Sequence, residues 1–238
     1  MERSFDEMRA RCVAAGLDLI GVARIADYDA RVPPALALAP HAPAARSAVV
    51  VGSAGRRFWD VFRAAPPPGP DPLDAFTRRL LEATLGPLAP DERLVFPFVG
   101  ATPPASFAHL AECAGLGRPS LLGVLVHPTY GPWIALRAAL LVRDDLVAPR
   151  PADGFDPCAT CADRPCIAAC PAGAIGPAGW DVPRCADHRL RPVDACADGC
   201  HARLACPWGA AYRHPPEARA FHQAAARRGM AALRAARG

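Results

Sequence analysis

The chain has 238 residues and a net charge of +4, and every basic side chain is an arginine. This charge is mild and dispersed, whereas nucleic-acid binders cluster theirs, and no segment approaches the ~20 uninterrupted apolar residues of a membrane span. The polar start of the chain also lacks the apolar core of a signal peptide. We therefore expect a cytoplasmic protein with no nucleic-acid partner and no membrane partner.

Capping residues and helical spacing predict helices over residues 4–16, 74–85 and 106–116. Apolar runs predict strands over residues 18–23, 48–52 and 94–98. The third of these contains Pro97, which favours the edge of a sheet because proline cannot donate a ladder hydrogen bond. The Pro- and Ala-rich residues 31–43 are expected to be an extended crossing segment.

Two further β runs, 121–126 and 133–142, flank a turn rich in proline and glycine. They predict an antiparallel hairpin with a wide loop. A proline- and glycine-rich linker follows, and a basic amphipathic helix over 217–236 ends the chain. These elements predict an α+β domain at 1–152, a cysteine-rich module at 153–214 and a C-terminal basic helix at 215–238.

Eight of the ten cysteines lie in the module and form two half-motifs, each of which closes on Cys-Pro. The first half holds Cys158, Cys161, Cys166 and Cys170, and the second holds Cys185, Cys196, Cys200 and Cys206. Close spacing lets one loop wrap an iron–sulfur cluster, and in two-cluster ferredoxins the fourth, Cys-Pro cysteine ligates the other cluster. The pattern therefore predicts two [4Fe-4S] clusters and a role in electron transfer.

The crossing assigns one cysteine of each half to the other half's cluster. One ligand set is then Cys158, Cys161, Cys166 and Cys206, and the other is Cys170, Cys185, Cys196 and Cys200. The loops are longer than in a ferredoxin, since four residues separate Cys161 from Cys166. A structural zinc site, disulfides and buried free thiols are the alternatives. The two remaining cysteines, Cys12 and Cys113, fall in predicted helices and are expected to be core thiols.

Three segments carry a resemblance to bacterial epoxyqueuosine reductases. They are Gly16 to Ala23, Ala114 to Gly117 with the following Tyr130-Gly131-Pro132-Trp133, and Cys206-Pro207-Trp208. Residues 122–137, with His127-Pro128-Thr129-Tyr130-Gly131-Pro132-Trp133, resemble the hairpin of the type C cobalamin-processing proteins, and reductive dehalogenases share the general plan.

This resemblance implies a nitroreductase-like antiparallel sheet that holds base-off cobalamin, followed by a ferredoxin-like 2[4Fe-4S] module that feeds electrons to the cobalt. A redox partner protein or another low-potential donor would supply the electrons. The residues that the resemblance assigns to the small-molecule cofactor are His127, Tyr130, Trp133 and Arg137. Their alternative roles are a turn histidine, hairpin packing and a strand-face arginine.

The chain departs from the epoxyqueuosine reductases in two respects. Counting back from Ala114, their catalytic aspartate falls at Ala101, which has no proton to donate, and their helical repeats after the clusters are missing. Queuosine chemistry on tRNA is therefore not expected. Two other functions stay open: an electron carrier without its own catalytic cofactor, and an FMN-dependent reductase, for which Arg56 and Arg57 form the obvious basic pair at the phosphate.

Overall fold

The computed structural model describes residues 5–98, 100–147 and 154–235 and divides the chain into two compact units. The first unit comprises Met1–Gly117 and Ile134–Asp153, and the second comprises Arg118–Trp133 and Gly154–Gly238. The expected division at 152/153 assigned every earlier residue to one domain and separated the last helix from the cysteines. Instead, residues 118–133 and the last helix both group with the cysteines.

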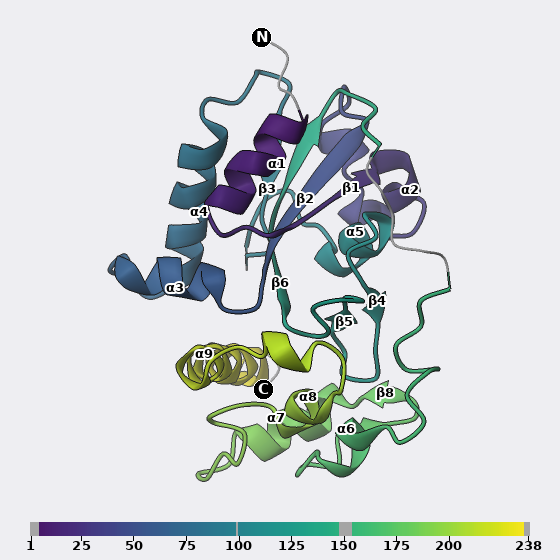
Figure 1. Ribbon diagram of the computed structural model, residues 1–238, viewed down its shortest axis with the longest axis vertical. Coiled ribbons are helices and arrows are strands. Elements are labelled where there is room, and N and C mark those ends of the chain that lie inside the picture. The colour runs from purple at the N-terminus through teal and green to yellow at the C-terminus, as the bar shows by residue number, and fades with distance from the viewer. Residues whose placement is uncertain (1–4, 99, 148–153, 236–238) are drawn as a thin grey trace. The chain divides into compact units, whose positions relative to one another are not determined.

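A four-stranded antiparallel sheet forms the centre of the first unit, in the order β1-β2-β6-β3 (Figure 1). Its strands are β1 (Leu19–Arg24), β2 (Ser47–Ala54), β6 (Ile134–Val142) and β3 (Arg93–Val95). Strand β2 is buried throughout and β6 is buried over its last six residues, which is why both are rich in apolar residues. The short strand β3 lies at an edge, as Pro97 predicted.

Helices cover this sheet. They are α1 (Phe5–Ala14), α2 (Ile25–Asp29), α3 (Arg57–Ala64), α4 (Pro72–Leu85) and α5 (Phe107–Cys113). Helix α1 packs on α4, and α5 packs on β1 and β2 (Figure 1). Gly21 permits a close approach at β1, because a Cβ there would lie 2.6 Å from the carbonyl oxygen of Ala114. An α+β unit with an antiparallel sheet was predicted and is confirmed.

One local expectation for the first unit is wrong, and another falls on a residue outside the described ranges. Residues 31–43 are not extended but contain two 3-10 helices, η1 (Pro34–Leu36) and η2 (Ala39–His41). The Tyr28 hydroxyl donates to the carbonyl of Leu36, and the Asp29 carboxylate accepts from the backbone of Leu38, so side chains fold this segment back. Ser4, the predicted cap of α1, lies outside the described residues.

The predicted hairpin between 121–126 and 133–142 is wrong. Strand β5 (Leu125–Val126) pairs with β4 (Arg118–Pro119), whereas β6 pairs with β2 and β3. The backbone N–H of Gly123 donates to the carbonyl of Ser120, and Gly123 has φ +72°. The chain therefore turns back within the first apolar run, which leaves only two of its residues as a strand.

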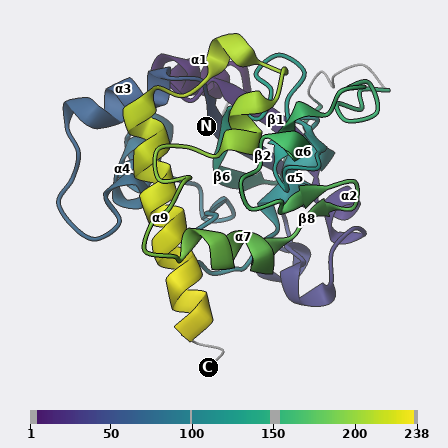
Figure 2. The same cartoon turned by 90° about the horizontal axis from the view of Figure 1, so that it is seen from below.

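The second unit consists of short elements. They are β4, β5, α6 (Pro165–Ala168), β7 (Ile175–Gly176), β8 (Gly179–Trp180), α7 (Val182–Arg189), α8 (His201–Ala205), η3 (Ala210–Tyr212) and α9 (Pro216–Ala235). Helix α9 lies against α7 (Figure 2), and the guanidinium of Arg227 donates to the carbonyl of Arg191. In the part of the chain that the structure describes, no helix has the length and apolar character needed to cross a bilayer.

Candidate metal centre

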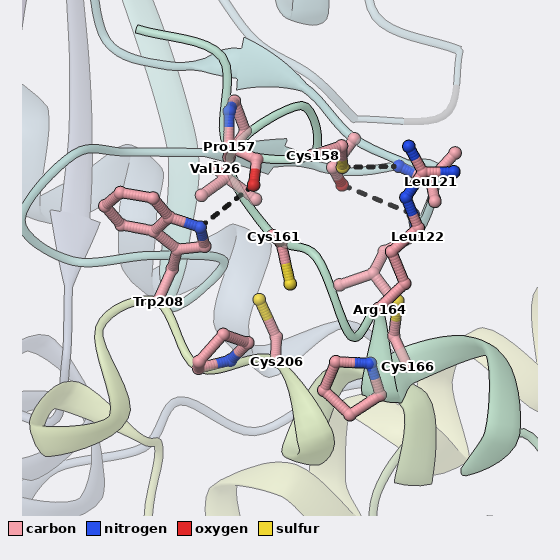
Figure 3. Close-up of a pocket in the computed structure, with 13 residues that line it drawn as sticks. Leu121, Leu122, Val126, Pro157, Cys158, Cys161, Arg164, Cys166, Cys206 and Trp208 are labelled. Carbon is pink, nitrogen blue, oxygen red and sulfur yellow. Dashed lines mark hydrogen bonds between the residues drawn. The ribbon is translucent and has the colours of Figure 1, made fainter.

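Four cysteines from the two ends of the module line one pocket: Cys158, Cys161, Cys166 and Cys206. Cys161 and Cys206 direct their sulfur atoms toward one another (Figure 3). The remaining wall is largely apolar and includes Leu121, Leu122, Val126, Pro157 and Trp208. The pocket therefore brings four thiols together within a largely apolar wall.

Local structure explains how the chain presents these thiols. The carboxylate of Asp156 accepts the backbone N–H of Cys158 at 3.0 Å, which forms a turn that directs the loop. Cys166 lies on α6, which begins at Pro165, and Cys206 follows the last residue of α8. The indole N–H of Trp208 donates to the carbonyl of Pro157 at 3.1 Å, so the two ends of the module are tied together (Figure 3).

We call Cys158, Cys161, Cys166 and Cys206, which line this pocket, the first group. One of them receives a hydrogen bond of the kind that stabilises thiolate ligands. The backbone N–H of Leu121 donates to the sulfur of Cys158 at 3.5 Å. Burial raises the pKa of Cys166 and of Cys206, and the charges of neighbouring cysteines raise both further. In the absence of a compensating positive charge these thiols would thus stay protonated, and a bound metal is what would ionise them.

The other four module cysteines form a second group. Burial raises the pKa of Cys185, and the charges of Cys200 and Cys170 raise it further. Burial also raises the pKa of Cys196 to about 11, with an additional effect of Cys200. The N–H of Ala174 donates to the sulfur of Cys170 at 3.4 Å. The side chain of Trp180 forms a hydrogen bond with Cys185, so this group also has sulfur-directed donors.

The pocket contains the four cysteines of one predicted ligand set, including Cys206 from the second half-motif, and the charge of Cys170 acts on Cys185 of the other set. That these cysteines ligate two clusters stays a prediction. None of the ten cysteines, all of which lie among the described residues, forms a disulfide, and Cys12 and Cys113 are buried in α1 and α5. Among the described residues no three His, Cys, Asp or Glu side chains lie close enough to hold a single metal ion. Thiolates around a [4Fe-4S] cluster meet a different requirement, because each ligates a separate iron.

Residues 130 and 131 contact residues 208 and 209, which follow the last cysteine of the second half-motif, within the second unit. Gly131 has φ +59°, and a Cβ there would lie 2.0 Å from the carbonyl oxygen of Trp208. Gly209 has φ +63°, and a Cβ there would lie 2.2 Å from the carbonyl of Tyr130. Backbone thus packs directly on backbone, which only glycine permits at both positions. The sequence singled out these two segments separately, and the fold brings them together.

His127 organises the turn of this segment. Its Nδ1 accepts the backbone N–H groups of Thr129 at 3.0 Å and of Tyr130 at 3.2 Å. The backbones of His127 and Gly131 exchange two further hydrogen bonds. Burial lowers the pKa of His127 to about 4, so its ring is neutral at neutral pH. The ring packs on Tyr130 with centroids 4.7 Å apart, and Tyr212 meets Tyr130 edge-on at 4.8 Å.

Trp133 is enclosed, with only 1% of its surface exposed. The guanidinium of Arg203 lies over its ring at 4.7 Å, and His214 meets it at 5.5 Å. These contacts give Trp133 a packing role in the second unit. His127 and Tyr130 lie in the same unit, so three of the four residues predicted to bind a cofactor are close in the fold.

Arg137, the fourth, lies on β6 of the first unit and is not grouped with them. Its Nε donates to the Ser53 hydroxyl at 3.2 Å, and its guanidinium lies over the Phe58 ring at 4.2 Å. Burial lowers its pKa to about 10, while the carboxylate of Asp74 acts in the opposite direction. The assignment of all four residues to a cofactor stays a prediction.

Several residues of the centre were not found from the sequence. Asp194 accepts the N–H of Cys196 at 2.9 Å, as Asp156 does for Cys158, and the shared pattern Asp-x-Cys was the available signal. Asp194 also forms a buried ion pair with Arg189 at 3.3 Å. Arg203 was missed as well, because nothing in its neighbourhood distinguishes a buried arginine from a solvated one.

No protein-family model and no curated protein sequence matches the chain. Solved structures do. The epoxyqueuosine reductase from Bacillus subtilis aligns with a TM-score of 0.59 and 18% identity over 90% of this chain and 69% of its own. The enzyme from Streptococcus thermophilus aligns with a TM-score of 0.55 and 15% identity over 88% and 67%. A reductive dehalogenase solved for its mechanism of B12-dependent dehalogenation aligns with a TM-score of 0.53 and 19% identity over 91% and 35%.

At these identities the likeness is one of fold, and it extends over nearly all of this chain. The chain spans only about a third of the dehalogenase. The resemblance seen in the sequence is thereby confirmed: the chain has the fold that epoxyqueuosine reductases and reductive dehalogenases share.

Proposed function

We propose that the chain is an iron–sulfur oxidoreductase. In this proposal Cys158, Cys161, Cys166 and Cys206 hold one [4Fe-4S] cluster, and Cys170, Cys185, Cys196 and Cys200 hold the other. One observation carries the proposal. Four thiols from both ends of the module line a single pocket whose remaining wall is largely apolar. Four thiolates with hydrogen-bond donors to sulfur are the ligand set that such a cluster requires.

The residues present fit the group in three respects. The proposed ligands are all cysteines, backbone N–H groups of Leu121 and Ala174 donate to their sulfurs, and the wall around the first group is largely apolar. When bound, the clusters supply one-electron transfer. Leu122, Val126 and Trp208 line the pocket of the first group, and an apolar surrounding disfavours extra negative charge and so favours a low reduction potential.

We infer further that the electrons pass to a cobalamin held by the predicted N-terminal domain, residues 1–152, from a redox partner protein or another low-potential donor. The fold supports this, because the chain shares it with a dehalogenase solved for B12-dependent chemistry. A strongly reducing electron source is what reduction of cobalt in cobalamin demands, and buried clusters with low potentials meet that demand.

Ala101 favours a second candidate, a ferredoxin-type carrier without its own catalytic cofactor. Its methyl side chain cannot act as the proton donor that the epoxyqueuosine reductase resemblance assigns to this position. An FMN-dependent reductase receives less support. Arg57 forms an ion pair with Asp18 at 3.0 Å, and Arg56 forms one with Asp60 at 3.0 Å, so the charge that a flavin phosphate would use is already offset.

Anaerobic purification with iron and sulfide analysis tests the clusters. We expect about eight irons per chain, and a Cys206→Ser variant should lose about half of them. Cys113→Ser is the matched control, because it removes a buried thiol outside the module, and it should keep all of them. Zinc in place of iron, or full iron retention in Cys206→Ser, would contradict the ligand assignment.

Titration of the anaerobic protein with cobalamin separates the candidate functions. A shift of the cobalamin absorption from the base-on to the base-off form supports the first proposal. The absence of a shift together with tight FMN binding would favour the flavin reductase. Binding of neither ligand, with both clusters present, would favour the carrier.

A further inference from the structure

Arg203 is the middle residue of α8, the short helix whose two ends carry one cysteine of each group. Cys200 is the N-cap of this helix and Cys206 is its C-cap. Arg203 therefore lies three residues from a member of the second group and three residues from a member of the first. Among the described helices whose caps are given, α8 alone has cysteines of the two groups as its N-cap and C-cap.

The guanidinium of Arg203 is held in place by neutral partners. Its Nε donates to the carbonyl of Pro132 at 3.0 Å, and its Nη2 donates to the same oxygen. Its charge lies over the ring of Trp133. Among the described residues no carboxylate pairs with it within 4.0 Å. Its positive charge is thus fixed in position and is not offset by an acidic neighbour.

The charges that Arg203 faces are those of the two cysteine groups. Burial lowers its pKa to about 10, whereas negative charge on Cys200 and on Cys206 favours its protonated form. Arg189 is a useful comparison. It is also buried, but Asp194 pairs with it, and its effect is on Cys185 and Cys196, which both belong to the second group. Arg203 is therefore the cation placed to act on both groups.

We propose that Arg203 is a positioning residue that sets the reduction potentials of both clusters together, through a fixed positive charge on the helix that joins them. The inference rests on the proposed function, because it needs two clusters. Each thiolate-ligated cluster is negatively charged and gains one further negative charge when it accepts one electron from an external reductant. A nearby cation stabilises the reduced form more than the oxidised form, and low local dielectric strengthens the effect.

The test is a potentiometric titration of the anaerobic, cluster-loaded protein with titanium(III) as the reductant, followed by electron paramagnetic resonance. Arg203→Gln should lower both midpoint potentials, because it removes the charge. Arg203→Lys keeps the charge but not the planar fork, and its potentials should stay closer to the wild-type values than those of the glutamine variant. Arg228→Gln removes a charge from an exposed position on α9 and should shift neither potential.

The iron content of each sample separates a failure of this inference from a failure of the proposed function. A wild-type protein with far fewer than about eight irons would overturn the proposed function itself. With both clusters present, unchanged potentials in Arg203→Gln, or a shift in only one of them, would overturn the role of Arg203. If Arg203→Gln loses iron, the lysine variant decides: potentials near the wild-type values support the charge, and a fall of both refutes it.

Discussion

Acidification should destabilise the second unit through His127. The Nδ1 atom of this histidine accepts two backbone N–H groups, from Thr129 and Tyr130, so a proton on Nδ1 would break both hydrogen bonds. Burial lowers the pKa of the ring to about 4, whereas an unfolded histidine titrates near pH ~6.5. Between these two pKa values the unfolded chain binds a proton at His127 and the folded chain does not. The stabilisation is therefore complete above about pH 6.5 and is lost as the pH falls toward 4.

The size of the effect follows from the two pKa values. Between pH 7 and pH 5 the unfolded state gains stability through protonation while the folded state gains almost none, which lowers the unfolding free energy by about 2 kcal/mol. The assay is anaerobic guanidinium unfolding at both pH values, followed by circular dichroism. A titration of the His127 ring by nuclear magnetic resonance gives the pKa directly.

His127→Asn is the matched variant. The amide oxygen of asparagine can take the place of Nδ1 as acceptor for the turn, and asparagine does not titrate. The variant should therefore fold and should lose about 2 kcal/mol less than the wild type between pH 7 and pH 5. Equal losses in the two proteins, or a His127 ring that titrates near its ordinary value, would refute the reasoning.

Three further substitutions or reactions test other parts of the fold. Gly131→Ala should lower the unfolding free energy by about 3 kcal/mol, because it combines positive φ with a backbone clash, whereas Gly176→Ala, with open space at its Cβ, should cost far less; guanidinium unfolding compares them. Burial raises the pKa of Cys12 to about 11, so iodoacetamide at pH 8 should leave this thiol unlabelled until the chain unfolds, and labelling in the folded protein, seen by mass spectrometry, would contradict its burial. Arg137→Met should lower the midpoint temperature of unfolding by removing the hydrogen bond to Ser53 and the cation–π contact, a loss of about 2 kcal/mol; an unchanged midpoint would mean that neither contact contributes.

The central sheet could be predicted because its signals are local. The apolar run of β2 and the proline after β3 each fix a strand and its place without reference to the rest of the chain. The partner of a strand is not a local property. The run 133–142 is equally compatible with a hairpin and with the centre of a sheet, and the choice depended on Gly123, which turns the preceding run back on itself.

The cysteines could be found for a similar reason, because their spacing is a local property of the sequence. The residues that surround them in the fold could not be predicted. Arg203 and Arg189 look like surface arginines until α8 and α7 are folded, and the role of Gly131 depends on contact with Gly209 far along the chain. The predicted boundaries place residues 118–133 with the first domain, whereas they group with the cysteines in the structure, and no composition change marks the crossings at 117/118 and 133/134.

Because the chain crosses between the units, the cysteine module is built from two separate segments of the sequence. A ferredoxin-like module inserted at a linker would contain everything that its clusters need. Here the N–H donor to Cys158 comes from Leu121, and the acceptor for Arg203 is the carbonyl of Pro132. Both lie in the segment that interrupts the first unit between α5 and β6. The second unit is thus built from two separate parts of the sequence, and residues 118–133 supply contacts to the cysteines and to Arg203 in residues 154–235.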